Sequence, residues 1–377
     1  MVQRIDFYSS LLREIYQDAY NYFGPENWDV HRYGNPEILF KKRILQNLNR
    51  ILGKRLAVLP VAERNLPDFE RIICDYGEGL SVLYENLANQ SSRDLLVKVI
   101  AYRILGYRKV KLPLNTGDYF TTRQVMHNLI GRQEAIIPGF MDWKLDYFEL
   151  DSLGFPIRLY YTPLGIHTLF VLKQYEYNKS DKTIKVHYGD YVIDGGGCWG
   201  DTALYFAHEA GEAGKVFTFE FVEKNLEILH RNLNLNPAMQ QYISIMPHPL
   251  WSESDKMLDW DENGPGTSVS LQTGRDSDIV NHPQITTLSI DDLLSRYKVP
   301  RIDFIKLDIE GAEYEALRGA ISTIRRYRPR LAVCLYHHLD DFLRIPAFIL
   351  SLDLGYRLFL DHFSIYDEET ILFADAE

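Results

Sequence analysis

A glycine-rich stretch in the middle of the chain limits the possible folds most strongly. In "VIDGGGCWGD" (Val192–Asp201) a short apolar run and an acid precede three glycines, and a fourth glycine and a second acid follow. Two patterns overlap here: G-x-G-x-x-G from Gly195, which is typical of dinucleotide-binding loops, and D-x-G-x-x-x-G from Asp194. A strand that turns through such a loop into a helix forms the ligand crevice of an open α/β sheet.

The chain after this loop alternates between strand-like and helix-like stretches. The strand-like stretches are Tyr191–Ile193, Lys215–Phe221, Ile243–Met246, Phe304–Leu307 and Leu331–Tyr336. The helix-like stretches are Asp201–His208, Glu223–Asn236 and Ala312–Arg326. This alternation predicts a parallel sheet with helices on both faces. Two further strand-like stretches, Tyr356–Leu360 and Thr370–Phe373, leave no room for a helix between them and predict a terminal antiparallel hairpin. The predicted fold is therefore α/β, with a mixed seven-stranded sheet.

The sequence before the glycine loop has two regions with different patterns, the first helix-like and the second strand-like. In Ile5–Phe23 apolar residues recur every three or four positions, which predicts a helix. Further helices are predicted at Asp68–Leu87 and from Ser91 or Ser92, with an approximate capping box, to near Gly106. From Lys109 the chain looks extended, and residues 147–177 alternate as strands would. We expect a helical N-terminal domain (1–108), a strand-rich connecting region (109–182) and an α/β domain (183–377).

The composition of the chain limits which binding partners and which cellular location we expect for the protein. The net charge of −11 disfavours a broad nucleic-acid footprint and an anionic membrane surface as partners. Three cysteines without a C-x-x-C pair give no disulfide framework and no zinc signature. No apolar stretch approaches the ~18 residues of a membrane-spanning helix, and the N-terminus lacks the apolar segment of a signal peptide. The sequence predicts a cytoplasmic protein.

Charge separates the two cofactors that the glycine loop allows. Glu220 ends the next predicted strand, 26 residues after Asp194, where its carboxylate can accept both hydroxyls of an adenosine ribose. A dinucleotide adds a pyrophosphate, which acids at the loop would repel. S-adenosyl-L-methionine (SAM) instead brings a sulfonium and an ammonium, which Asp194 and Asp201 would attract. The sequence favours SAM, and the predicted terminal hairpin is also familiar from SAM-dependent methyltransferases.

Five ordered motifs resemble the FkbM-type SAM-dependent methyltransferases. They are "VIDGGGCWGD", "FEF", "SIDDLL", "IKLDIEGAE" and "LYHHLDDF", and "EETILFA" follows them. The resemblance covers about half of the chain, Tyr191 to Ala374, and Val222 departs from the proline that many members have after F-E. It implies a class I methyltransferase with a Rossmann-like sheet. Such an enzyme methylates a hydroxyl of a small molecule or sugar, in a secondary metabolite or polysaccharide, and leaves S-adenosyl-L-homocysteine.

The resemblance also assigns the site residues. SAM would be bound by Asp194, Gly195, Gly196, Gly197, Gly200, Glu220 and Asp308. The catalytic candidates are His337, Asp308 and Glu310, which follow two strand ends. An alcohol needs a base within hydrogen-bond reach, and His337 is the most base-like because its ordinary pKa near 6.5 leaves it largely neutral. It could equally hydrogen-bond a carboxylate and hold the shape of the site.

The remaining hypotheses concern the pairing of a lysine, a possible metal ion, a flap over the acceptor and alternative functions of the protein. Lys306 could pair structurally with an acid. Asp308, Glu310 and Glu313 could gather round a hard cation, but acids at a helix start usually serve as dipole partners and caps, so no metal is expected. Trp260–Asp278 could form a flap over the acceptor. The alternatives are an NAD(P)-dependent oxidoreductase or a non-catalytic SAM-binding protein. The N-terminal helices are candidates for a homo-oligomer contact.

Overall fold

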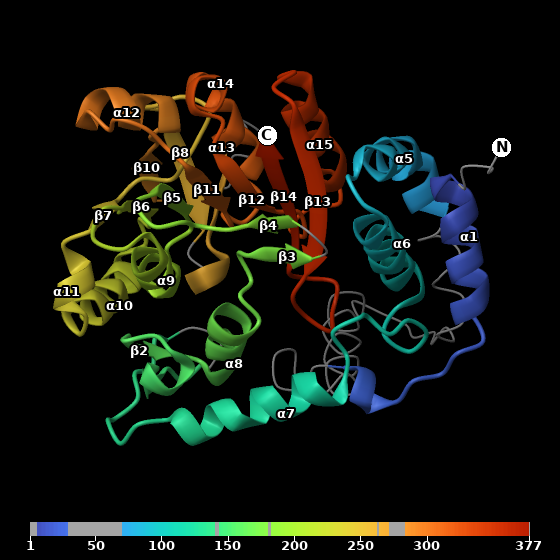
Figure 1. Cartoon of the computed structure of the whole chain (residues 1–377), viewed down its shortest axis with the longest axis horizontal. Helices are drawn as coiled ribbons and strands as arrows, with labels where there is room; N and C mark the ends of the chain where they lie inside the picture. The colour runs from blue at the N-terminus through green and yellow to red at the C-terminus, as the bar shows by residue number, and fades with distance from the viewer. Residues whose placement is uncertain are drawn as a thin grey trace, which may run out of the picture.

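A seven-stranded sheet forms the centre of the computed structural model, which describes residues 6–28, 70–139, 143–179, 182–261, 264–270 and 283–376. Its strand order is β13-β14-β12-β11-β5-β6-β7 (Figure 1). The strands are β5 (Tyr191–Gly195), β6 (Lys215–Phe219), β7 (Ile243–Met246), β11 (Phe304–Leu307), β12 (Arg330–Cys334), β13 (Tyr356–His362) and β14 (Thr370–Ala376).

The strand directions confirm the predicted mixed sheet. The neighbours from β12 to β7 pair in parallel. The last strand, β14, lies between β12 and β13 and is antiparallel to both. This hairpin forms because only seven residues separate β13 from β14, which is too short for a crossover helix.

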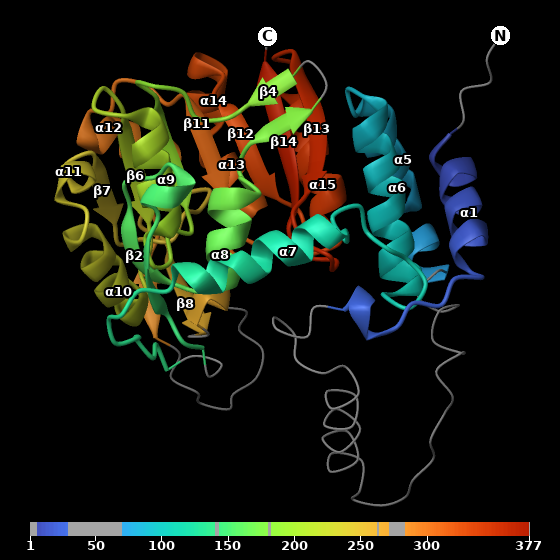
Figure 2. The same cartoon turned by 60° about the horizontal axis from the view of Figure 1, so that its bottom comes forward.

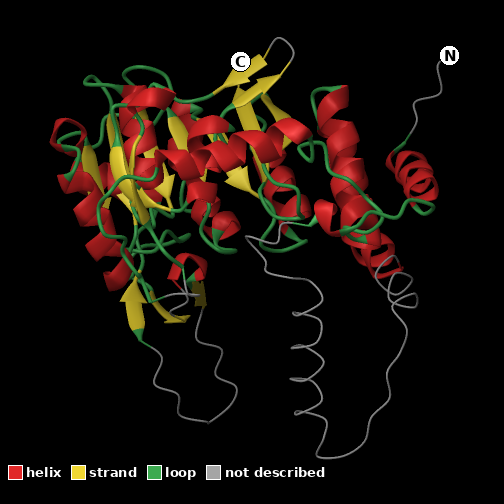
Figure 3. Ribbon diagram, turned by 90° about the horizontal axis from the view of Figure 1, so that it is seen from below, coloured by secondary structure: helices red, strands yellow, loops and turns green. Residues whose placement is uncertain are grey.

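Two hydrophobic cores lie on opposite faces of the sheet, because successive side chains of a strand point to opposite sides. Val192 belongs to one core and Ile193 to the other, and Phe304 and Ile305 divide in the same way. One core includes α9 (Asp201–Ala210) and α10 (Glu223–Asn234). The helices of the other face are α12 (Ile290–Tyr297), α13 (Glu313–Arg318), α14 (Ile321–Tyr327) and α15 (Asp341–Ser351). Figure 3 shows helices on both sides of the strands.

The N-terminal helices lie beside the edge strand β13 (Figures 1 and 2). They are α1 (Phe7–Asp18), α5 (Gly77–Asn86) after a π-helical turn η3 (Ile72–Tyr76), and α6 (Gln90–Leu105). Their apolar side chains share one core with α12 to α15. The Ala88 amide donates to the Leu358 carbonyl at 2.8 Å. Helix α6 begins earlier than predicted, because Asn89 rather than Ser91 or Ser92 caps it by accepting from an amide of the first turn.

The connecting region contains more helix than the sequence predicts. Helix α7 (Gly117–Met126) lies where the chain was expected to be extended, and it contacts α8 (Pro163–Ile166), which is next to it in Figure 2. The strands β1 (Asp146–Glu149) and β2 (Arg158–Tyr161) are present, but the strand prediction is wrong from Pro163 to Val171. There Thr162 caps α8, whose first residue is proline, and α8 continues into a π-helix, η6 (His167–Val171).

Smaller elements complete the description. The hairpin β3 (Tyr177–Lys179) and β4 (Lys182–Ile184) precedes β5, and a three-stranded sheet contains β8 (Met257–Asp261), β9 (Ser268–Ser270) and β10 (Gln284–Thr286). Short helical turns are η1 (Pro25–Asn27), η4 (His127–Leu129), η5 (Asp151–Leu153), α11 (Pro237–Gln240) and η7 (Gly264–Gly266). The predicted flap falls on β8, η7 and β9, and its residues 262–263 and 271–278 lie outside the described ranges. Within those ranges no helix is long and apolar enough to cross a membrane.

Candidate active site

The glycine loop turns tightly against β6 and the end of β11. Gly196 has φ +82°, and a Cβ atom there would lie 1.9 Å from the main-chain oxygen of Asp308. A Cβ on Gly197 would lie 2.0 Å from Oγ1 of Thr218. Gly200, with φ +83°, is the N-cap of α9. These positions exclude side chains, so the predicted glycines are needed for the backbone to pass between two strands.

The carboxylate of Asp194 lies behind this loop. It is fully buried and accepts hydrogen bonds from the hydroxyls of Thr202 (2.9 Å) and Thr218 (2.8 Å). Lys306 Nζ lies 3.2 Å from it and donates to the carbonyls of Gly195 and Gly196. The expected structural pairing of Lys306 is therefore confirmed. The carboxylate of Asp194 therefore stabilises the loop through these contacts, and it does not line the cavity described next.

A cavity of about 520 Å³ lies over the carboxyl ends of the parallel strands. Of the predicted site residues, Gly196, Glu220, Asp308 and Glu310 line it, whereas Asp194, Gly195, Gly197, Gly200 and His337 are not among its lining residues. The opposite wall comes from the connecting region between Arg123 and Tyr175 and from the part of the flap around Gly264 to Val269. The described residues before Arg123 contribute nothing to the lining.

Glu220 stands just after β6 with only 7% of its surface exposed. One carboxylate oxygen accepts from the amides of Phe221 and Val222, both at 2.7 Å, and the other accepts from the Asn225 side chain at 3.2 Å. Burial raises its pKa to about 7, against the lowering effect of these hydrogen bonds. Asp201, in the first turn of α9, also lines the cavity, and burial raises its pKa to about 6.

Asp308 follows β11 and is held by two tyrosines. The Tyr175 hydroxyl donates to one carboxylate oxygen and the Tyr336 hydroxyl to the other, each at 2.8 Å. Burial alone would raise the pKa of Asp308, but the positive charges of Lys306 and His337, with the two hydroxyls, hold it below its usual value. Asp308 is therefore an ionised carboxylate at the cavity wall, and each of its oxygens accepts a hydrogen bond.

Glu310 differs from Asp308 in both backbone and ionisation. Its φ is +56°, an uncommon value for a residue with a side chain, and 34% of its side chain remains exposed. Burial raises its pKa to about 7, and the charge of His337 opposes this rise. The negative charges of Asp308, Glu313 and Glu369 raise it further. Among the predicted catalytic residues, Glu310 thus combines access to the cavity with a pKa near neutrality.

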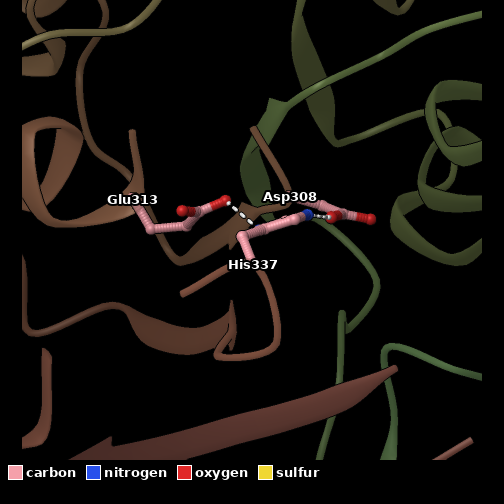
Figure 4. Close-up of side chains that lie close together, drawn as sticks. All are labelled: Asp308, Glu313 and His337. Atoms are coloured by element: carbon pink, nitrogen blue, oxygen red, sulfur yellow. Dashed lines mark ion pairs between the residues drawn. The ribbon is translucent and has the colours of Figure 1, made fainter. Parts of the chain in front are cut away.

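His337 lies between two carboxylates (Figure 4). Its Nδ1 is 3.0 Å from the fully buried Glu313, and its Nε2 is 3.4 Å from Asp308 and 3.6 Å from Glu310. Burial alone would lower its pKa, but the three carboxylates raise it to about 10. The expectation of a largely neutral His337 is therefore wrong, because the sequence could not show how many carboxylates surround the ring.

The same group bears on the metal hypothesis. One ligand atom each from Asp308, Glu313 and His337 lie within 4.8 Å of one another. However, the two ring nitrogens face different carboxylates (Figure 4). That arrangement suits an imidazolium bridging two carboxylates.

Some cavity residues have no signal in the sequence. Tyr175 and Gln174 reach the site from outside the predicted strand ends, and only their long-range contacts reveal them. Glu369 lies in the quoted "EETILFA" segment, but its bond with Gln174 could not be derived from spacing. Tyr336 lies in a quoted motif, but its bond to Asp308 could not be derived from spacing.

Comparison with known proteins assigns the family. Residues 184–358 match the methyltransferase FkbM domain. A methyltransferase FkbM from Methylobacillus flagellatus KT is 18% identical, with a TM-score of 0.49, and the match covers 88% of this chain and 70% of that one. An O-methyltransferase from Bacillus cereus in complex with SAH is 13% identical, with a TM-score of 0.35, over 57% of this chain and 82% of that one.

A SAM-dependent O-methyltransferase from Thermotoga maritima is 15% identical, with a TM-score of 0.31, over 50% of this chain and 60% of that one. No curated protein matches the chain significantly. The domain match and the ordered motifs agree with the strand order and the glycine loop described above. The chain therefore carries a methyltransferase domain of the FkbM family, and S-adenosyl-L-methionine is its cofactor.

Proposed function

We propose that the protein O-methylates a hydroxyl group of a small molecule or sugar, with Glu310 as the general base. The observation that carries this proposal is the environment of Glu310, a cavity-lining carboxylate with a pKa of about 7. Such a group is half ionised near neutral pH, which is the range in which a base is effective. Asp308, whose pKa is lowered and whose two oxygens each accept a hydrogen bond, is less suited to accept a proton.

The cofactor end of the cavity fits SAM better than a dinucleotide. Gly196, Asp201 and Glu220 line it, and Asp201 stands in the first turn of α9, where a pyrophosphate would otherwise bind. An acid there repels phosphate and attracts a cation. In this proposal Gly195, Gly197 and Gly200 shape the loop, Asp194 supports it, and Glu220 accepts hydrogen bonds from the ribose.

The chemistry requires one proton transfer by the protein. SAM, when bound, supplies a methyl group activated by a positively charged sulfur. The acceptor oxygen forms a bond to the methyl carbon while the carbon–sulfur bond breaks, and that electron pair stays on sulfur. The acceptor proton passes to a carboxylate oxygen of Glu310. His337 is a positioning residue here, since its imidazolium lies against Glu313 and keeps Asp308 and Glu310 in place.

Calorimetry with SAM, S-adenosylhomocysteine and NADH tests the cofactor assignment, because only the two sulfur compounds should bind. Turnover is then measured against pH with a panel of hydroxyl-bearing acceptors. Glu310→Gln should lower turnover by about 10²–10⁴ with SAM affinity nearly unchanged. The exposed Glu212→Gln serves as the matched control. Full turnover in Glu310→Gln would refute the assigned base, and SAM binding without turnover by any acceptor would favour a non-catalytic protein.

A further inference from the structure

The side chain of Asn225 is buried next to the cofactor end of the cavity. It stands in the first turn of α10, is 4% exposed, and is not among the lining residues. Its amide bonds to the indole of Trp199 in the glycine loop, to the carboxylate of Glu220 after β6, and to the carbonyl of Gly264 at the start of η7. All three partners line the cavity. One side chain therefore connects three segments around the cofactor end.

The indole of Trp199 fixes the direction of this amide. Trp199 is 1% exposed, and its Nε1 donates to Oδ1 of Asn225 at 3.1 Å. An indole nitrogen can donate a hydrogen bond but cannot accept one, so the oxygen of the amide must face it. The two hydrogens of Nδ2 then point to Oε2 of Glu220 at 3.2 Å and to the Gly264 carbonyl at 3.4 Å. A flipped amide would lose all three bonds.

These bonds bear on the ionisation of Glu220. Its Oε1 accepts from the amides of Phe221 and Val222, and its Oε2 accepts from Asn225. Each of these bonds favours the carboxylate, whereas burial favours the protonated form and raises the pKa to about 7. Loss of the Asn225 donor should therefore move the titration of Glu220 above neutral pH.

Other titratable side chains line the cavity on the elements around Glu220. They are Cys198, Asp201, His248, Lys306 and Asp308. The Asn225 amide bonds to Trp199, Glu220 and Gly264 rather than to any of these groups. Replacing Asn225 leaves their charges in place, so a change in the pH dependence of binding can be assigned to Glu220.

We propose that Asn225 is a positioning residue for the cofactor, which orients the Glu220 carboxylate toward the ribose and thereby sets the pH range in which SAM binds tightly. This inference rests on the proposed contact between Glu220 and the ribose. The motif residues that the sequence singles out do not include Asn225, because its role follows from partners in three separate segments.

Calorimetric titration of the full chain with SAM, from about pH 6 to about pH 9, tests the proposal. In Asn225→Leu the rise of Kd at low pH should begin about one pH unit higher than in the wild type. The Kd should then be raised about fivefold at pH 7, about tenfold at pH 6, and hardly at all at pH 9. The matched control is Asn232→Leu. Asn232 is fully buried on the same helix and bonds to the main chain of Tyr160 and Trp199, not to Glu220. Its loss should lower the free energy of unfolding in urea without moving the pH at which Kd rises.

A second variant separates positioning from damage to the fold. Asn225→Leu leaves the buried Trp199 N–H without its acceptor, so adding Trp199→Phe should recover part of the stability while the displaced pH dependence remains. The same pH dependence in the wild type and Asn225→Leu, an equal displacement in Asn232→Leu, or no SAM binding at pH 9 by either folded Asn225 variant would each overturn the inference. A wild-type Kd that does not change with pH, or a pH dependence that survives in Glu220→Gln, would instead overturn the assignment of the ribose to Glu220.

Discussion

The affinity for SAM should depend on pH through Glu220. The pKa of this carboxyl is about 7, compared with its ordinary value of 4.5. The difference corresponds to about 3 kcal/mol by which the fold disfavours the ionised form. Because the pKa of Glu220 is raised in the folded protein, the protonated carboxyl stabilises the fold relative to the ionised one. This stabilisation is fully present below pH 4.5 and is lost as the pH rises through 7.

Ribose hydroxyls would donate to the ionised carboxylate, so binding should be coupled to proton release below the pKa. We expect the Kd of SAM to be nearly constant above pH 7 and to rise by up to about tenfold per pH unit below it. Asp201, with a pKa of about 6, adds a weaker dependence at lower pH.

Glu220→Gln should remove most of this dependence and weaken binding. The amides of Phe221 and Val222 both donate to one oxygen of Glu220, so the glutamine must keep its carbonyl there. Its NH₂ group then faces Asn225 and the cavity and offers donors where the ribose needs an acceptor. The expected loss is about 1–3 kcal/mol, or roughly 5- to 150-fold in Kd.

Isothermal titration calorimetry over a pH series spanning the Glu220 pKa, in buffers of different ionisation enthalpy, measures both the Kd and the proton release. Glu212→Gln is the control for adding an amide on the surface, and Asp201→Asn separates the second titrating acid. Equal affinities and equal proton release in wild type and Glu220→Gln would refute the assignment of the ribose to Glu220.

Three further substitutions test how the site is held. Lys306→Met should lower the free energy of unfolding by about 3–5 kcal/mol in urea, because buried Asp194 loses its counter-charge, and adding Asp194→Asn should recover part of the loss. Gly196→Ala should cost about 3 kcal/mol or more, whereas Gly106→Ala, with a similar φ of +76° but open space, should cost clearly less. The raised pKa of His337 stabilises the fold fully below pH 6.5, and this stabilisation is lost as the pH rises through about 10. His337→Asn should therefore be most destabilised, relative to the wild type, near pH 6.5 and progressively less so toward pH 10. A constant difference across that range would contradict the imidazolium.

Local patterns allowed prediction of the sheet and the glycine loop, whereas partners far apart in sequence could not be predicted. The glycines from Gly195 to Gly200 sit on a short strand-to-helix turn, so their spacing carries the signal. The strand prediction failed at Pro163–Val171 because apolar residues there also fit a short buried helix. The pKa of His337 and the pairing of Gln174 with Glu369 depend on contacts that no spacing encodes.

The way in which the edge of the sheet is closed affects how this domain can be moved between proteins. The family match ends at residue 358, inside β13, and leaves out β14, which hydrogen-bonds to both β12 and β13. On the outer side of β13, Ala88 and Ser92 bond to its backbone. A fragment cut to the match would expose strand edges that can pair with other chains. A chimera or a recombination event must therefore carry the helices before the domain together with the strand after it, as one inherited unit.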